Sequence, residues 1–254
     1  MGRRRVSKPR IVNPEDWLNL PDFKRQTPAL MEEMVDCCRS IVSSGTTSPV
    51  VFTLFNPIPQ AIQISGLERF KEHCILVPDM VKAGIERITM NTLHAIDAFT
   101  ATGARGAYYV TQHMQNGLIS PDMYREFARQ GDRLCMSMCS GLDYPIFHIH
   151  GEDVFLALPD MPANCIVHYE YTVANRHPVA FHAAYPYRLM LGIPVPIMKS
   201  CQSDVEIASC IGNHLEFDTS AELIVAGCVM PLDFPETKIR TWVEAVKTFH
   251  RDGA

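Results

Sequence analysis

Two histidines, His148 and His150, stand two residues apart at the end of an apolar run, Tyr144–His150, that predicts a β-strand. Alternate residues of a strand point to the same face, so we expect both imidazoles on one face. Gly151 follows directly, where a strand can end and the backbone can approach a ligand. Two neighbouring imidazoles need polar partners or a cation. The pattern alone therefore leaves two interpretations open, a metal site or a pair of packed polar histidines.

A cysteine provides a third candidate ligand. Cys228 ends the apolar run Glu222–Cys228, directly after Gly227 and shortly before Pro231. A thiol at the end of this strand would face the same end of the sheet as the histidine pair. Two histidines and one cysteine suit Zn²⁺, with the fourth position left for water or substrate. The alternative is a small buried cysteine that packs against the closing helix.

Other polar residues follow the ends of predicted strands. Glu152 and Glu170 are the candidate catalytic residues, because a carboxylate can orient a ligand or move a proton. Each of the remaining side chains could orient a substrate or could be a loop residue bonded to backbone. These candidate substrate-binding residues are Asn56, Gln112, His113 and Tyr169.

The elements that must position these residues alternate between apolar runs and amphipathic helices. Strands are expected at 50–56, 107–112, 144–150, 166–172, 188–193 and 222–228. Helices are expected at 78–101, 120–140, 154–158, 173–184 and 204–216, with a closing helix from about Pro235. The second of these begins at Ser120-Pro121, an N-cap followed by proline in the first turn. This N-cap supports the helix at 120–140, and the apolar stripes of the longest helices support the helical assignment of those segments.

Apolar strands between helices predict a parallel sheet that is covered on both faces. No G-x-G-x-x-G motif follows a strand, so a dinucleotide-binding fold has no support. The candidate polar residues gather at the carboxyl ends of the strands, where a barrel has its active site. We therefore predict an α/β fold, a TIM-barrel-like (β/α)8 architecture that is incomplete, with about six strands visible. Residues 1–45 are expected to form an arm and a helix, and residues 46–254 the barrel domain.

Composition limits the classes of partner and the location that we expect. The net charge of -5 gives no reason to expect nucleic acid. No apolar stretch approaches the ~20 residues that a membrane span needs. Nine cysteines scattered through predicted helices and strands do not form a disulfide framework, and they indicate a reducing, cytoplasmic location.

Two blocks of the sequence resemble a known family. The segment Tyr144–Gly151 is similar to the strand that ends H-x-C-G in the cobamide-dependent methyltransferase branch of the uroporphyrinogen decarboxylase superfamily. The segments Ile224–Pro231 and Pro235–Val246 are similar to that family's G-C-containing last strand and closing helix, the most specific part of the resemblance. The likeness extends from about Val50 to the C-terminus. It implies an eight-stranded barrel, a small-molecule substrate and a possible corrinoid methyl donor, and a zinc ion held by His148, His150 and Cys228.

The sequence departs from the family at two places. His150 stands where the motif has cysteine, which replaces an anionic ligand by a neutral one and makes the metal a stronger Lewis acid. The chain also begins near the third strand, without the arginine-rich loop and the aspartate that true uroporphyrinogen decarboxylases use. We therefore expect a reaction other than the decarboxylation of uroporphyrinogen. The open edge strand at 50–56 should be covered by the N-terminal 40 residues, by a second copy in a homodimer or by a completing subunit.

Three functions remain. The leading hypothesis is a zinc-dependent methyl (one-carbon) transferase. The second is a metal-free decarboxylase or lyase of the same superfamily, in which the histidine pair binds a carboxylate or protonates a carbanion. This second function needs cations at the mouth of the barrel, for which the candidates are Arg105, Arg176, Arg188 and Lys199. The third is a non-catalytic barrel subunit that needs a partner.

Overall fold

The computed structural model of the chain describes residues 8–170, 174, 178–201, 203–216 and 223–252. It divides into two compact units. The first comprises Met1–His148 and Phe155–Cys165, and the second comprises Ile149–Val154 and Ile166–Ala254.

Six strands among the described residues form the sheet, in the order β1-β2-β3-β4-β5-β6. Their bounds are β1 Val51–Phe55, β2 Gly106–Thr111, β3 Tyr144–Ile149, β4 Ile166–Tyr169, β5 Arg188–Ile193 and β6 Leu223–Ala226. The pairs β1–β2, β4–β5 and β5–β6 are parallel. Five of these strands lie within a predicted run, and β2 begins one residue before its run. Neighbours in the sequence are therefore neighbours in the sheet, as in a (β/α) barrel.

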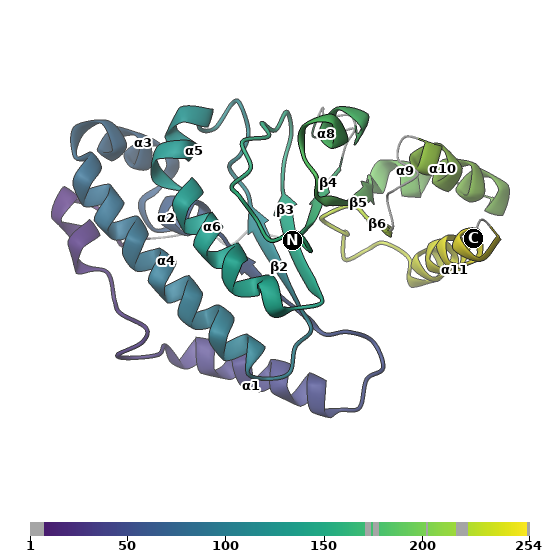
Figure 1. Cartoon of the computed structure of the whole chain (residues 1–254), viewed down its shortest axis with the longest axis horizontal. Helices are drawn as coiled ribbons and strands as arrows, with labels where there is room; N and C mark the ends of the chain where they lie inside the picture. Colours follow the sequence, from purple (N-terminus) through teal and green to yellow (C-terminus); the bar gives the residue numbers. More distant parts are fainter. Residues whose placement is uncertain (1–7, 171–173, 175–177, 202, 217–222, 253–254) are drawn as a thin grey trace. The chain divides into compact units, whose positions relative to one another are not determined.

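Helices of the first unit pack around the long helix α4 (Figure 1). The elements are η1 Pro14–Asn19, α1 Ala29–Ser43, α2 Pro57–Ser65, α3 Leu67–Leu76, α4 Pro78–Thr100, α5 Pro121–Phe127, α6 Arg129–Met138 and η2 Cys139–Gly141. The predicted apolar face of α4 is buried at Val81, Ile85, Ile88, Ile96 and Phe99. Burial of this stripe, rather than helix propensity, stabilises a helix of this kind.

The segment before α1 belongs to the core of the first unit. Trp17 is 1% exposed, and its Nε1 donates a hydrogen bond to His73 Nδ1 of α3 at 2.9 Å. A Cβ at position 84 of α4 would lie 2.5 Å from Trp17 Cε3, so Gly84 makes room for the indole. This segment lies against α3 and α4, while Val51 and Phe55 of β1 remain 36% and 42% exposed.

Two helix predictions need correction. The helix expected at 120–140 is divided at Ala128 into α5 and α6, although its N-cap is confirmed because Ser120 Oγ accepts from Met123 N. The helix expected at 154–158 is wrong. Val154 N donates to Ala174 O and Phe155 N to Met114 O, so these backbone groups bond to distant segments instead of to a helical turn.

Other elements were missed or only partly described. The prediction did not include α2, α3 or α9 (Val195–Ser200). Both α2 and α9 have a proline in the first turn, where helices accept it. Of the helix expected at 173–184, the structure has α8 at Pro178–Ala184, and positions 173 and 175–177 lie outside the described residues.

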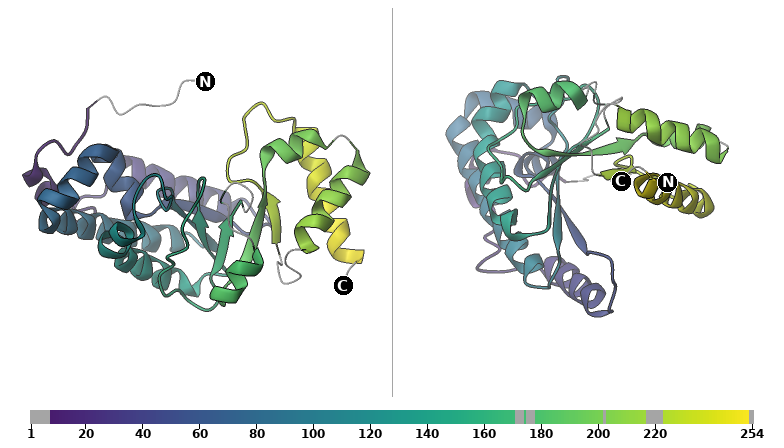
Figure 2. Two further views of the ribbon diagram at one scale, coloured as in Figure 1. Left: turned by 90° about the horizontal axis from the view of Figure 1, so that it is seen from above. Right: turned by 45° about the vertical axis from the view of Figure 1, so that its right-hand side comes forward.

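The second unit has its own core beside β5. The helices α10 (Asp204–Glu216) and α11 (Glu236–Asp252) lie side by side (Figure 2). In the predicted stripe of α11, Trp242 is buried and Ile239 and Val246 pack against the core, whereas Val243 is 45% exposed. The buried cluster comprises Ile193, Met198, Cys201, Ile207, Cys210, Ile211, Phe234 and Trp242. Within the described part of the chain, no helix is long and apolar enough to cross a membrane.

Candidate metal centre

The end of β3 carries both predicted histidine ligands. His148 lies within the strand and is 2% exposed, and His150 follows the last strand residue and is half-buried. The ring of His148 stacks on Tyr108 of β2, with ring centroids 4.9 Å apart. Its carbonyl oxygen accepts a hydrogen bond from Thr111 Oγ1 at 3.0 Å. Neighbouring strand β2 thus fixes the position of His148.

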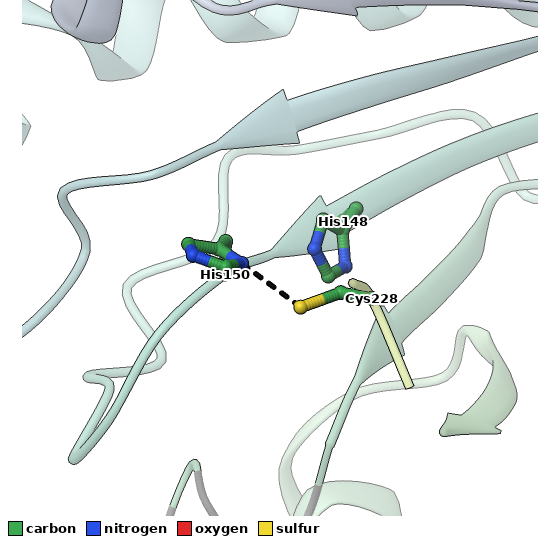
Figure 3. A group of neighbouring side chains, drawn as sticks. All are labelled: His148, His150 and Cys228. Carbon is green, nitrogen blue, oxygen red and sulfur yellow. Dashed lines mark hydrogen bonds between the residues drawn. The ribbon is translucent and has the colours of Figure 1, made fainter. Parts of the chain in front are cut away.

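Cys228 lies beside the second histidine. It follows β6 by two residues, and its Sγ lies 2.9 Å from His150 Nδ1. The atoms that His148, His150 and Cys228 can offer to a metal ion all lie within 4.8 Å of one another (Figure 3). The structure therefore brings together the three side chains that the sequence predicted as ligands.

Glu170 contacts the backbone of the cysteine. It is the first residue after β4, and its Oε1 accepts a hydrogen bond from Cys228 N at 2.5 Å. A hydrogen bond to an ionised acceptor is stronger than one between neutral groups. The carboxylate thus fixes the position of the Cys228 backbone, as residues that contact metal ligands from outside the coordination shell do.

Two glycines make room for this carboxylate. A Cβ at Gly227 would lie 2.5 Å from Glu170 Oε1. A Cβ at Gly192 of β5 would lie 3.1 Å from Glu170 Cγ and 2.8 Å from His168 Nε2. The prediction identified Glu170 but not the need for these glycines. The signal available in the sequence was a glycine near the carboxyl end of each of two consecutive strands.

Burial controls the protonation of the site. It lowers the pKa of His150, although the nearby Glu170 carboxylate acts in the opposite direction. Burial and the negative charge of Glu170 together raise the pKa of the Cys228 thiol to about 12. The protein alone therefore holds a neutral imidazole beside a protonated thiol. A metal ion bound there would displace the thiol proton, because the thiolate is the ligand form.

The site opens into a small cavity of the second unit, with a volume of about 280 Å³. Its walls combine apolar side chains with two carboxylates and the two ligand candidates of this unit. The lining residues are Ile149, His150, Gly151, Glu152, Glu170, Val195, Pro196, Cys228 and Val229. Glu152 is an exposed residue at this wall, whereas Glu170 is half-buried.

The predicted substrate-binding residues are not among the described residues that line this cavity. Asn56 is 1% exposed, and its Nδ2 donates to both carboxylate oxygens of Asp132 at 3.1 Å. Tyr109 and Tyr124 donate to the same carboxylate at 2.8 and 2.7 Å. Burial raises the pKa of Asp132 to about 6, against the hydrogen bonds from these three side chains, which lower it. The contacts of Asn56 are those of a core residue of the first unit.

Tyr169 also packs away from the cavity. Its ring lies 5.9 Å from that of Phe181 in α8, whereas the adjacent residues His168 and Glu170 lie against Gly192 on the other face of β4. Gln112 and His113 follow β2 and are half-buried, with the Gln112 carbonyl accepting from Gln115 Nε2 at 2.6 Å. A substrate role for these residues stays a prediction.

Of the candidate cations for a decarboxylase, none that the structure describes lies at the carboxyl end of a strand. Arg105 precedes β2 at its amino end and pairs with Asp143 at 2.6 Å. Arg188 begins β5, at the end of the strand opposite to the cavity. Lys199 is exposed in the last turn of α9. Arg176 lies outside the described residues.

Comparison with known proteins gives matches at the level of family and fold. The family model described as uroporphyrinogen decarboxylase (URO-D) matches residues 3–249. The structure is similar to a methyltransferase from Methanosarcina mazei, with a TM-score of 0.70 and 16% identity over 85% of this chain and 64% of that one. No curated protein matches the chain.

Two further solved structures share the fold. A B12-independent methionine synthase from Shewanella sp. W3-18-1, in complex with selenomethionine, gives a TM-score of 0.60 and 13% identity over 86% of this chain and 66% of that one. A putative vitamin-B12-independent methionine synthase from Listeria monocytogenes gives a TM-score of 0.53 and 14% identity over 89% of this chain and 69% of that one. The chain thus spans about two thirds of the length of the solved structures that it resembles.

Proposed function

Because the chain belongs to the uroporphyrinogen decarboxylase (URO-D) family, we propose that it is a zinc-dependent enzyme that transfers a methyl (one-carbon) group to a small substrate. The observation that carries this proposal is the convergence of His148, His150 and Cys228, whose ligand atoms lie within 4.8 Å of one another. The similarity in fold to proteins named as a methyltransferase and as methionine synthases supports the same class of reaction.

The donor set fits zinc. Two imidazoles and one thiolate are ligands that Zn²⁺ accepts, and three protein ligands leave a fourth position for substrate. When bound, the ion would act as a Lewis acid that lowers the pKa of a water or thiol in the open position. Since His150 is neutral, the protein contributes one thiolate, that of Cys228, to the charge of the site. A corrinoid is a possible methyl donor.

The surrounding residues have distinct roles in this proposal. Glu170 positions Cys228 through the backbone N–H and, as the half-buried carboxylate of the cavity, can take up the proton of an acceptor. Glu152 lies in the wall of the same cavity, where it can orient the substrate. Apolar side chains of Ile149 and Val195 shield the reacting atoms from water.

The alternative, a metal-free decarboxylase or lyase, has less support. It requires cations to hold a carboxylate group, whereas Arg105, Arg188 and Lys199 lie at strand starts or on the outside of a helix. The cavity instead presents the carboxylates of Glu152 and Glu170. A purely structural subunit would have no use for three convergent ligands.

Metal analysis of the purified protein tests the proposal. We expect about one zinc per chain, as in other sites with three protein ligands, and loss of that zinc in the Cys228→Ala and His150→Ala variants. Cys37→Ala, which changes an exposed cysteine of α1, is the matched control and should retain the metal. If the wild-type protein binds no zinc even after zinc is supplied, the proposed function is wrong.

A further inference from the structure

A second cavity lies in the first unit, between the segment before α1 (residues 8–28) and the helices α2 and α4. Its volume is about 200 Å³. None of its lining residues belongs to the candidate metal centre, and the proposed function makes no use of it. The class of ligand that fits this cavity therefore follows from its own walls.

Apolar side chains from three elements form most of the cavity wall. Leu20, Pro21 and Phe23 come from the segment before α1, Ile64 comes from α2 and Ile88 comes from α4. A dry apolar cavity of about 150 Å³ holds a benzene molecule. At about 200 Å³, this cavity has room for one aromatic ring. Transfer of such a ring from water to an apolar wall is favourable.

Hydrogen bonds hold the wall from the segment before α1 in place. Asn91 of α4 is 7% exposed, its Oδ1 accepts from Phe23 N at 3.0 Å and its Nδ2 donates to Pro21 O at 2.9 Å. Between these two residues, the carboxylate of Asp22 pairs with Arg87 of α4 at 2.8 Å, which balances its charge. The wall is therefore formed before a ligand binds, and binding does not have to order it.

Gln60 of α2 offers a hydrogen-bond acceptor to the cavity. Its Nε2 donates to Phe55 O at 2.8 Å and to Thr92 Oγ1 at 2.9 Å, which uses both N–H groups of the amide. The polar atom that remains is Oε1, which attracts donors and repels an anion. An anionic group of a ligand must therefore lie at a different part of the wall.

Arg10 carries the positive charge of the wall. Its side chain is exposed, and its Nη2 donates to Asn19 O at 3.2 Å. A guanidinium has five N–H groups, so most of them remain available to a ligand. Among the described residues, no carboxylate forms an ion pair with Arg10. This side chain can therefore hold an anionic group at the rim of the cavity.

The neighbours of Arg10 in the sequence do not cancel this charge. The nearest acidic residues are Glu15 and Asp16, and neither pairs with it in the described part of the chain. Backbone hydrogen bonds lower the pKa of Asp16 more than the charge of Arg10 does, which indicates that the two charges interact weakly. Residues 1–7 include three arginines and no acidic residue.

From these contacts we infer that the cavity is a binding site for a small aromatic carboxylic acid. The carboxylate lies against the guanidinium of Arg10, with which it can form two parallel hydrogen bonds. The ring lies between Phe23, Ile64 and Ile88, where it leaves water. An aromatic cation would gain the same ring contacts but would be repelled by Arg10. The inference does not depend on the proposed function, because no candidate metal ligand lines this cavity.

Phenylacetate is the probe, and isoleucine methyl groups report by NMR where it binds. The whole chain is labelled at the isoleucine δ1 methyl groups, and the signals of Ile64 and Ile88 are assigned from Ile64→Val and Ile88→Val variants. The ring of a bound probe shifts the methyl signals next to it. Ile41, which is 48% exposed on α1, is the reference for non-specific contact. Phenylacetamide and benzylamine present an aromatic ring with a neutral and a cationic group.

We expect the signals of Ile64 and Ile88 to shift with phenylacetate and to saturate, with a Kd on the order of 1 mM. Phenylacetamide should bind about 5-fold more weakly, since it keeps the ring but loses the charge, and benzylamine should bind most weakly. Arg10→Gln should weaken phenylacetate binding by about 5-fold and leave phenylacetamide binding nearly unchanged. Arg133→Gln, which removes an exposed charge from α6, should change neither.

The inference is wrong if Ile64 and Ile88 show no saturable shift, or if Ile41 shifts as much as they do. Binding of phenylacetamide or benzylamine as tight as that of phenylacetate would overturn it as well, as would unchanged phenylacetate binding in Arg10→Gln. The zinc content of the same preparation is measured separately. Loss of either result leaves the other standing, because the cavity and the candidate metal ligands share no residue.

Discussion

Replacing Gly227 by alanine should weaken metal binding although no candidate metal ligand is substituted. The new Cβ would lie 2.5 Å from Glu170 Oε1 and 2.9 Å from Glu170 Cδ, whereas real Cβ atoms essentially never come closer than 3.0 Å to another heavy atom. The carboxylate must therefore move by about 0.5 Å or more. This movement stretches the 2.5 Å hydrogen bond that fixes Cys228. Changes to such outer-shell partners typically reduce metal affinity about 10- to 100-fold.

Zinc affinity, measured by competition with a chromophoric chelator, checks this expectation. Gly117→Ala is the matched control, since a Cβ there meets nothing within 4 Å. In a Glu170→Ala background, Gly227→Ala should cost less affinity, because the side chain with which it collides is gone and the Cβ would then meet Ile193 O at 3.1 Å. Thermal unfolding of each variant separates a local effect from loss of the fold. Wild-type zinc affinity in Gly227→Ala would refute the reasoning.

Three further expectations concern stability and assembly. Burial raises the pKa of Asp132 in the folded protein to about 6, from an ordinary value of 3.8, so its stabilising contribution is complete below pH 3.8 and is lost as the pH rises through 6. Urea unfolding should show a fall on the order of 2–3 kcal/mol across that window, and an unchanged fall in Asp132→Asn would contradict this assignment. Trp17→Ala should lower the free energy of unfolding by about 3–5 kcal/mol, whereas an unchanged melting temperature would show that the indole adds nothing to the core. We expect a second copy or a companion protein to cover the outer edge of β1. Light scattering should then give a mass above that of one chain, and Phe55→Lys should lower it to that of one chain. A wild-type chain that is monomeric without a companion would rule this out.

The alternation of strands and helices was predictable from the sequence because it depends on local periodicity. Apolar runs of strand length located all six described strands, and the 3.6-residue repeat located α4. Local patterns failed where distant partners decided the conformation. Val154 and Phe155 are examples, because their backbone N–H groups bond to Ala174 and Met114. The helix α2 was likewise not predicted, although its prolines lie in a helical first turn.

The pairing of His148 with His150 also followed from the sequence, since two residues that are two apart in a strand must share a face. The sequence likewise identified Cys228 and Glu170 as residues at strand ends. Only the tertiary structure decided that Cys228, 78 positions after His150, lies 2.9 Å from it, and that Glu170 bonds to the cysteine's backbone. These contacts depend on how β4, β5 and β6 align with one another, and on the space that Gly192 and Gly227 leave between them. Periodicity along one chain segment specifies which way a side chain points, but the register between strands specifies what it meets.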